Sequence, residues 1–169
     1  MDAIECILTR RSIRSYSAEP IPDEIIHQLL LAAMHAPSAR NTQPWHFVVI
    51  RRRAALDQLA EMHPYGKMLQ EAGAAIAVCA DDKHQPLAGY QALDCAAATQ
   101  NILLAAHALG LGSVWLGIYP REERIKALAA FLSLPADIHP ISLVSIGYPA
   151  VEAQQVDRFD PSRIHNETW

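Results

Sequence analysis

The chain has 169 residues, with 14 Lys and Arg against 18 Asp and Glu, so its formal net charge is −4. Hydrophobic residues make up 51% of the sequence and charged residues 19%, a balance that excludes disorder of the whole chain. The length predicts a single domain over residues 1–169. The acidic excess argues against nucleic-acid binding, which requires clustered Lys and Arg.

The sequence carries no signal for a membrane or for secretion. No apolar run reaches the roughly 18 residues that a membrane-spanning helix needs. The first arginines follow a short apolar run, which is the reverse of the order in a secretory signal. Cys6, Cys79 and Cys95 are odd in number and form no CxxC pair, which indicates a reducing compartment. We therefore expect a cytoplasmic protein that makes no membrane contact.

The apolar content is high for one small domain. A compact chain of this length has a radius of gyration of about 15 Å, yet half of its residues are apolar. Either the core is unusually complete, or part of the apolar surface is buried against another chain or a large ligand. Composition leaves both explanations open.

Apolar spacing, together with start and stop residues, predicts six helices. They cover Ala3–Thr9, a segment with Asp23 as N-cap that continues to Ala36, Arg53–Met62, Tyr65–Ala72, Tyr90–Leu109 and Arg121–Phe131. The fifth helix is apolar nearly all round, so it should be buried on more than one face. Gly110, directly after it, is a typical helix stop.

Four apolar, β-branched runs lie between these helices, at His46–Arg51, Ala74–Ala80, Ser113–Ile118 and Ile141–Gly147. Such runs are typical of strands in the centre of a sheet. Helices that alternate with short strands predict an α+β or α/β fold with helices covering a sheet. The last 20 or so residues, from about 150 to 169, are polar and irregular, which predicts a tail that lies on a surface.

The first chemical candidate is the basic run Arg10-Arg11-Ser12-Ile13-Arg14. Guanidinium groups this close together repel one another unless an anion lies among them, and arginine binds phosphate through paired donors. A solvated basic turn explains the same residues equally well.

The second candidate is the loop that runs from Pro37 through Asn41 and Gln43 to Phe47. Its Asn and Gln side chains both donate and accept hydrogen bonds, which suits the edge of a heterocycle. The alternative is an ordinary turn after a helix, where Pro, Ser and Asn are common.

Two further features could belong to a ligand site. Gly117 could let backbone N–H groups approach a ligand, although a buried strand accounts for it too, and no GxGxxG fingerprint is present. Arg158 in the tail is either a ligand contact or a solvated side chain. The histidines show no HExxH or similar spacing, so we expect no metal site. GxSxG and P-loop motifs are also absent from the sequence.

Taken in order, these elements resemble the nitroreductase family of FMN-dependent oxidoreductases. The resemblance covers nearly the whole chain and rests on five elements, which are Arg10–Tyr16 (RRSxRx(F/Y)), Pro37–Phe47 (PSxxNxQPWxF), Gln100–Gly112, Gly117 with Ile146–Pro149, and Arg158. It implies an α+β fold, a central and mostly antiparallel sheet of four to five strands flanked by helices. It also implies a domain-entwined homodimer whose C-terminal tail lies on the partner subunit.

The resemblance further implies a set of cofactor-binding residues. Arg10, Arg11, Ser12 and Arg158 would bind the phosphate and ribityl region of FMN. Arg14 would face the N1/O2 edge of the flavin, where negative charge grows on reduction. Backbone groups of Leu116, Gly117 and Ile118 would approach flavin N5. The loop with Pro37, Ser38, Ala39, Asn41 and Gln43 would reach a flavin bound mainly by the other subunit.

The implied reaction needs no catalytic side chain, because the flavin carries the chemistry. NADH or NADPH would give a hydride to N5, and an acceptor such as a nitroaromatic or a quinone would then take the electrons in a ping-pong sequence. The alternatives are other flavin chemistry on this fold (a dehalogenase or a flavin-fragmenting enzyme) and a non-enzymatic flavin-binding module. The chain lacks room for the helical insertion of longer relatives, so we expect an open acceptor site, with Lys67 near the flavin edge.

Overall fold

The computed structural model describes residues 1–17 and 19–169. Its four strands form one sheet in the order β1-β2-β4-β3, with every neighbouring pair antiparallel. In chain order the elements are α1 (Ala3–Thr9), α2 (Asp23–Met34), a 3₁₀ turn (Ala39–Asn41), β1 (Trp45–Ile50), α3 (Arg53–Met62), a 3₁₀ turn (Lys67–Gln70), β2 (Ala74–Asp81), α4 (Ala88–Ala108), β3 (Gly112–Gly117), α5 (Glu122–Leu132), β4 (Ile138–Gly147) and a 3₁₀ turn (Pro161–Arg163).

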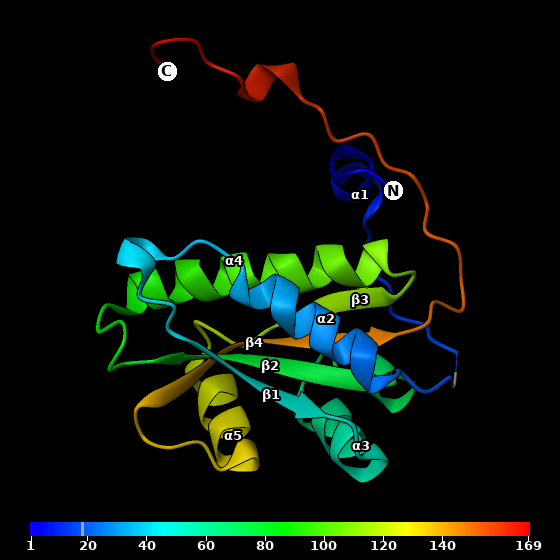
Figure 1. Cartoon of the computed structure of the whole chain (residues 1–169), viewed down its shortest axis with the longest axis vertical. Coiled ribbons are helices and arrows are strands. Elements are labelled where there is room, and N and C mark those ends of the chain that lie inside the picture. Colours follow the sequence, from blue (N-terminus) through cyan, green and yellow to red (C-terminus); the bar gives the residue numbers. More distant parts are fainter. Residues whose placement is uncertain (18) are drawn as a thin grey trace.

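The elements form three layers (Figure 1). Helices α2 and α4 cover one face of the sheet, and α3 and α5 cover the other. Helix α1 and the tail after β4 extend away from this body and lie beside each other. The expected α+β class, with an antiparallel sheet of four strands, is confirmed.

Strand β2 anchors both halves of the core. Its side chains alternate, so that Ala74, Ile76, Val78 and Ala80 belong to the cluster with α2 and α4, and Ala75, Ala77 and Cys79 belong to the cluster with α3 and α5. Every residue of β2 is buried. Burial raises the pKa of the Cys79 thiol to about 12, so this group is unreactive at neutral pH.

Several predicted boundaries are wrong. Asp23 is the first residue of α2 rather than its N-cap, which is Pro22 and makes no side-chain capping bond. The helix ends at Met34, before Ala36, because a residue that precedes a proline, here Pro37, disfavours the helical region. The helix expected at residues 65–72 is only the 3₁₀ turn Lys67–Gln70.

The expectation that all four strands are central is also wrong, since β1 and β3 are the edge strands. Their apolar runs have another cause, because helices cover both faces of the sheet, so that β3 is mostly buried and β1 is mostly half-buried. Helix α4 buries one face against the sheet and α2, while its Leu93 remains 66% exposed. Among the described residues, no helix is long and apolar enough to cross a membrane.

The segment with the arginine run crosses the start of β3 and the end of β4. The Ile13 amide donates to the Ser113 carbonyl at 3.0 Å, and Tyr16 forms an isolated bridge with Pro149. Burial raises the pKa of Tyr16 to about 12, so its hydroxyl is a reliable donor to the Ile13 carbonyl, 2.8 Å away. At Gly147 a Cβ atom would lie 2.6 Å from Cγ of Tyr16. Only glycine therefore lets this segment lie against the strand.

We predict that Gly147→Ala lowers the free energy of unfolding by about 1–3 kcal/mol, the usual cost of overpacking. The measurement is urea unfolding at fixed protein concentration. Gly89→Ala is the matched control, since a Cβ atom there meets nothing within 4 Å and alanine is the better helix former in α4. Equal stability of the Gly147→Ala protein and the wild type would show that the Tyr16 contact is not tight.

Candidate functional site

Three guanidinium groups converge between α1 and the tail. Arg10, Arg11 and Arg158 line one hollow of about 710 Å³. The pKa of Arg10 is lowered, first by burial and then by the positive charges of Arg158 and Arg11. The pKa of His107 is likewise lowered by burial and then by the positive charges of Arg10 and Arg11. An anion among these cations would relieve their repulsion, and phosphate suits arginine donors best.

Arg11 holds the tail in this position. Its Nε donates to the Gln154 carbonyl at 3.0 Å, and its Nη1 donates to the Leu8 carbonyl of α1 at 2.8 Å. One guanidinium group thus joins α1 to the tail, which brings Arg158 of the tail to Arg10 at the end of α1. The predicted cluster of Arg10, Arg11 and Arg158 is therefore assembled within one chain.

The outer edge of β3 leads away from this cluster. The Ser113 carbonyl faces that edge, where it accepts from Ile13, and the pairing alternates with a period of two. The backbone groups of Trp115 and Gly117 should therefore face the same edge. From Ser113 to Gly117 the strand rises about 13 Å, so an elongated ligand can lie along this edge with its phosphate at the arginines.

Gly117 is the last residue of β3, and two hydrogen bonds fix the direction of its carbonyl. Its carbonyl accepts from Nη1 of Arg124 at 2.8 Å and from Nε2 of His63 at 3.1 Å. The other ring nitrogen of His63 accepts from the Tyr65 amide at 3.2 Å, and burial lowers the pKa of this histidine. A Cβ atom on Gly117 would meet nothing within 4 Å, so a flat ring has space beside this backbone.

The loop before β1 is held in a strained conformation. Asn41 and Gln43 have positive φ angles of 56° and 47°, a region that residues other than glycine adopt at a cost. The Gln43 amide donates to Oγ of Ser38 at 3.0 Å, and the Ala39 amide donates to Oδ1 of buried Asp94 at 2.9 Å. These bonds fix the backbone, while the side chains of Asn41 and Gln43 stay exposed for a ligand.

This loop lies far from the arginine cluster of its own chain. The loop rests on Asp94 near the start of α4, whereas α1 contacts the other end through a 2.8 Å bond between Thr9 Oγ1 and His107 Nε2. The two contacts are 107 − 94 = 13 residues apart on one helix, or about 20 Å. The loop also leads into β1, and Gly117 ends β3 at the opposite edge of the sheet, about 14 Å away across three strand spacings.

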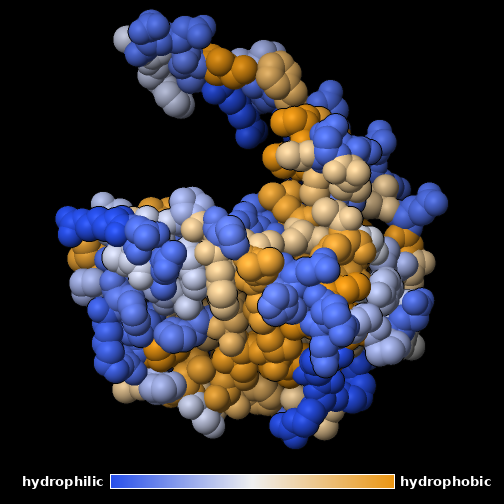
Figure 2. Space-filling model, viewed as in Figure 1, coloured by the Kyte–Doolittle hydropathy of each residue, from blue (hydrophilic) through white to orange (hydrophobic). Residues whose placement is uncertain are grey.

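Apolar side chains are exposed around α1 and over the body (Figure 2). In α1, Ile4, Ile7 and Leu8 are 66%, 54% and 65% exposed, and in the tail Phe159 is 75% exposed. An apolar hollow of about 320 Å³ separates α1 from α4. Exposed apolar surface of this kind marks an interaction site, and it accounts for the high apolar content of the sequence.

The remaining predicted residues are placed as follows. Ser12 and Arg14 are exposed on the segment that crosses β3, and Lys67 is exposed at the start of its 3₁₀ turn. The side chains of Leu116 and Ile118 are buried in the core, so only their backbones could meet a ligand. Sequence reasoning missed His63, Arg124 and Asp94, because each acts through a hydrogen bond to a backbone group outside its own segment, and no motif marks them.

Comparison with known proteins identifies the family. The model of the nitroreductase family matches residues 7–63 and 61–148 of this chain. The chain belongs to the nitroreductase family, and the predicted resemblance is confirmed.

Three relatives illustrate the similarity. A protein of Archaeoglobus fulgidus named "Putative NADH dehydrogenase/NAD(P)H nitroreductase" is 53% identical over 175 residues, which cover 99% of each chain. A solved structure of the same description from Parabacteroides distasonis is 40% identical, covers 98% of each chain and has a TM-score of 0.94. A "putative nitroreductase in complex with FMN" from Desulfovibrio desulfuricans is 34% identical, covers 100% of this chain and 99% of its own, and has a TM-score of 0.86.

Proposed function

We propose that this chain is an FMN-dependent NAD(P)H oxidoreductase that works as a homodimer. The observation that carries the proposal is the arrangement along β3. Arg10, Arg11 and Arg158 gather at its start, and open backbone at Gly117 lies at its end. This donor set fits FMN, because the arginines match a phosphate and the glycine leaves room for a planar ring. Relatives named NAD(P)H nitroreductase, and one structure that contains FMN, support the same cofactor.

When bound, FMN supplies two-electron chemistry, accepting a hydride and passing its electrons on. The chain supplies binding and orientation. Arg10 and Arg158 would hold the phosphate, and Arg14 would add positive charge near the ring, which would favour its reduction. His63 and Arg124 fix the Gly117 carbonyl from one side, so the peptide that faces the ring keeps one orientation.

We infer that the acceptor binds in an open hollow next to the end of β3. This hollow has a volume of about 310 Å³, and its lining includes His63 after α3, Ile118 after β3 and Arg124 of α5. One hollow of this size accommodates the nicotinamide and the acceptor in turn rather than together. We therefore infer a ping-pong sequence, with nitroaromatics and quinones as acceptor classes.

The distances within one chain support a homodimer. The loop with Asn41 and Gln43 is about 20 Å from the arginine end of α4, so it completes a flavin site only when it comes from a second copy. The exposed apolar side chains of α1 and the tail supply the surface that such a partner would cover.

The direct test is the visible spectrum of the purified protein. We expect flavin absorption, loss of that absorption on anaerobic addition of NADH or NADPH, and its return on addition of a nitroaromatic or a quinone. Colourless protein that fails to take up FMN would overturn the proposal. Bound flavin that both nicotinamides reduce only slowly would favour other flavin chemistry, and bound flavin without turnover of any acceptor would indicate a binding module.

Loss of one phosphate contact should weaken cofactor binding. Removal of a charge-assisted hydrogen bond costs about 1.5–3 kcal/mol, so Arg158→Ala should raise the Kd for FMN about tenfold or more in a fluorescence titration. Arg163→Ala is the matched control, because it removes the same charge from the tail but its guanidinium group bonds Asp160 instead. Equal effects of the two variants would remove Arg158 from the site.

A site shared between subunits predicts complementation. Arg10→Ala/Arg158→Ala damages one half of the site, and Asn41→Gly/Gln43→Gly removes the loop side chains while suiting their positive φ angles. Co-expression of the two variants should yield heterodimers in which one site has all four residues, so a fraction of sites regains wild-type FMN affinity. Verified heterodimers without such a fraction would place the whole site within one chain.

A further inference from the structure

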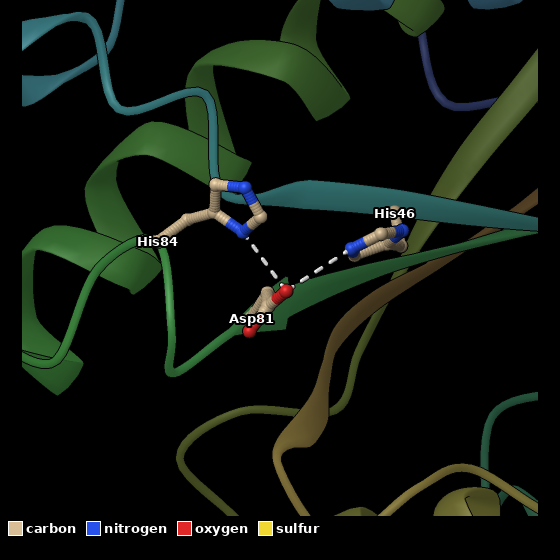
Figure 3. Close-up of side chains that lie close together, drawn as sticks. All are labelled: His46, Asp81 and His84. Atoms are coloured by element: carbon tan, nitrogen blue, oxygen red, sulfur yellow. Dashed lines mark hydrogen bonds and ion pairs between the residues drawn. The ribbon is translucent and has the colours of Figure 1, made fainter.

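Two imidazole rings and one carboxylate converge at the end of the sheet where β1 begins and β2 stops (Figure 3). Nε2 of His46 lies 3.4 Å from Oδ2 of Asp81, and Nδ1 of His84 lies 2.9 Å from the same oxygen. The three ligand atoms lie within 4.8 Å of one another. His46 is on β1, Asp81 ends β2 and His84 follows in the next turn, so antiparallel pairing assembles a group that no local spacing reveals.

The carboxylate is fixed before any ligand arrives. Asp81 is 6% exposed, and its amide donates to the Pro44 carbonyl at 2.8 Å. Oδ1 of Asp81 accepts from the Lys83 amide at 2.7 Å. That bond orients the side chain so that Oδ2 faces the two rings.

The two histidines leave an open side. Their side chains are 55% and 57% exposed, for His46 and His84 respectively. Their ring planes meet at 67°, with the centroids 6.5 Å apart, so the rings do not stack and each turns one nitrogen toward Asp81. Water can therefore reach the point where the three side chains meet.

The neighbouring aspartate, Asp82, contacts two other side chains instead of the histidine rings. Oδ2 of Asp82 contacts Nε2 of His139 at 2.8 Å, and Oδ1 of Asp82 accepts from Nε2 of Gln91 at 2.7 Å. The cluster therefore consists of two histidines and one aspartate rather than a broad acidic surface.

The spacing matches a small divalent ion. Bonds of zinc to imidazole nitrogen and carboxylate oxygen measure about 2.0–2.2 Å, which puts tetrahedral ligand atoms about 3.3 Å apart. The 3.4 Å and 2.9 Å separations bracket that value, and the two ring nitrogens lie within 4.8 Å of each other, so rotation of the exposed rings can bring all three ligand atoms to a metal ion. Imidazole ligands favour zinc, nickel or copper over magnesium and calcium, which prefer oxygen.

We propose that His46, Asp81 and His84 form a binding site for a divalent transition metal such as Zn²⁺, with water in the open position. This assignment departs from the expectation of no metal site, which rested on spacing in the sequence alone. His84 also lines a hollow of about 380 Å³ with Ala39 and Thr42 of the loop before β1. A bound ion would therefore tie the start of β1, and with it this loop, to the end of β2.

The test is calorimetric titration of Zn²⁺ into the full chain, free of affinity tags and of metal, with its flavin as purified. We expect saturable binding of one zinc per chain, no comparable binding of Mg²⁺, and a higher Tm in the presence of zinc. His46→Gln and His84→Gln should each lower zinc affinity by about 10–100-fold or more. Loss of a residue that only hydrogen-bonds a metal ligand already has an effect of this size. Both positions are exposed, so the variants should keep the wild-type Tm without zinc.

Two histidines outside the cluster serve as controls. His27→Gln changes an exposed histidine of α2, and His139→Gln changes the neighbouring histidine that contacts Asp82; zinc affinity should stay at the wild-type value in both. Absence of zinc binding to the wild type, equal binding after loss of His46 or His84, or an equal loss in His139→Gln would each overturn the assignment. Flavin content and NADH reduction are separate readouts, so failure here leaves the proposed oxidoreductase function intact.

Discussion

The length and rigidity of α4 govern how this molecule can build a site. The helix spans Ala88–Ala108 and packs along the sheet, so its two ends are held about 30 Å apart. One end carries the contacts of α1 and, through Arg11, the tail; the other carries Asp94 and the loop before β1. The two groups of residues proposed to bind FMN therefore contact α4 at points about 20 Å apart. In the proposed homodimer, a second copy would bring them together over the exposed apolar residues of α1.

For anion binding, the local cluster of arginines matters more than the net charge of the chain. The chain is acidic overall, at −4, yet the pKa of Arg10 is lowered by its burial and, in addition, by the positive charges of Arg158 and Arg11. Such an arrangement costs free energy in the absence of an anion and favours one when it is present. The tail is essential to this effect, because Arg158 reaches the cluster only while Arg11 bonds the tail carbonyls.

Much of the fold was predictable because its cause is local. Four strands and five of six helices lie within a few residues of their predicted bounds, since apolar periodicity reports directly on burial. The failures have two kinds of cause. Edge strands β1 and β3 looked central because helices cover both faces of the sheet, which only the folded chain shows. The segment around Tyr65 looked helical because its apolar spacing outweighed a local signal, since Pro64 and Gly66 leave room for only one 3₁₀ turn.

The residues of the candidate site likewise fall into two groups, those that a sequence motif marks and those that only the folded chain brings together. Arg10, Asn41 and Gly117 belong to continuous motifs, so sequence alone could nominate them. His63 and Arg124 meet at the Gly117 carbonyl from 54 and 7 residues away, and their roles depend on backbone atoms that every residue possesses. No composition or spacing distinguishes such residues before the chain is folded.

Two hydrogen bonds, one to a buried carboxylate and one from a backbone amide, hold the loop that forms the second half of the proposed site. Asp94 accepts the Ala39 amide at 2.9 Å, and the Asp81 amide donates to the Pro44 carbonyl at 2.8 Å. The loop between these contacts contains the positive φ angles of Asn41 and Gln43, which persist only where surrounding bonds over-determine the backbone. The bonds at both ends of this strained loop thus fix the backbone that carries the exposed amide side chains. Asp94 is the one acidic side chain among them, and it positions the loop that a partner's cofactor would meet.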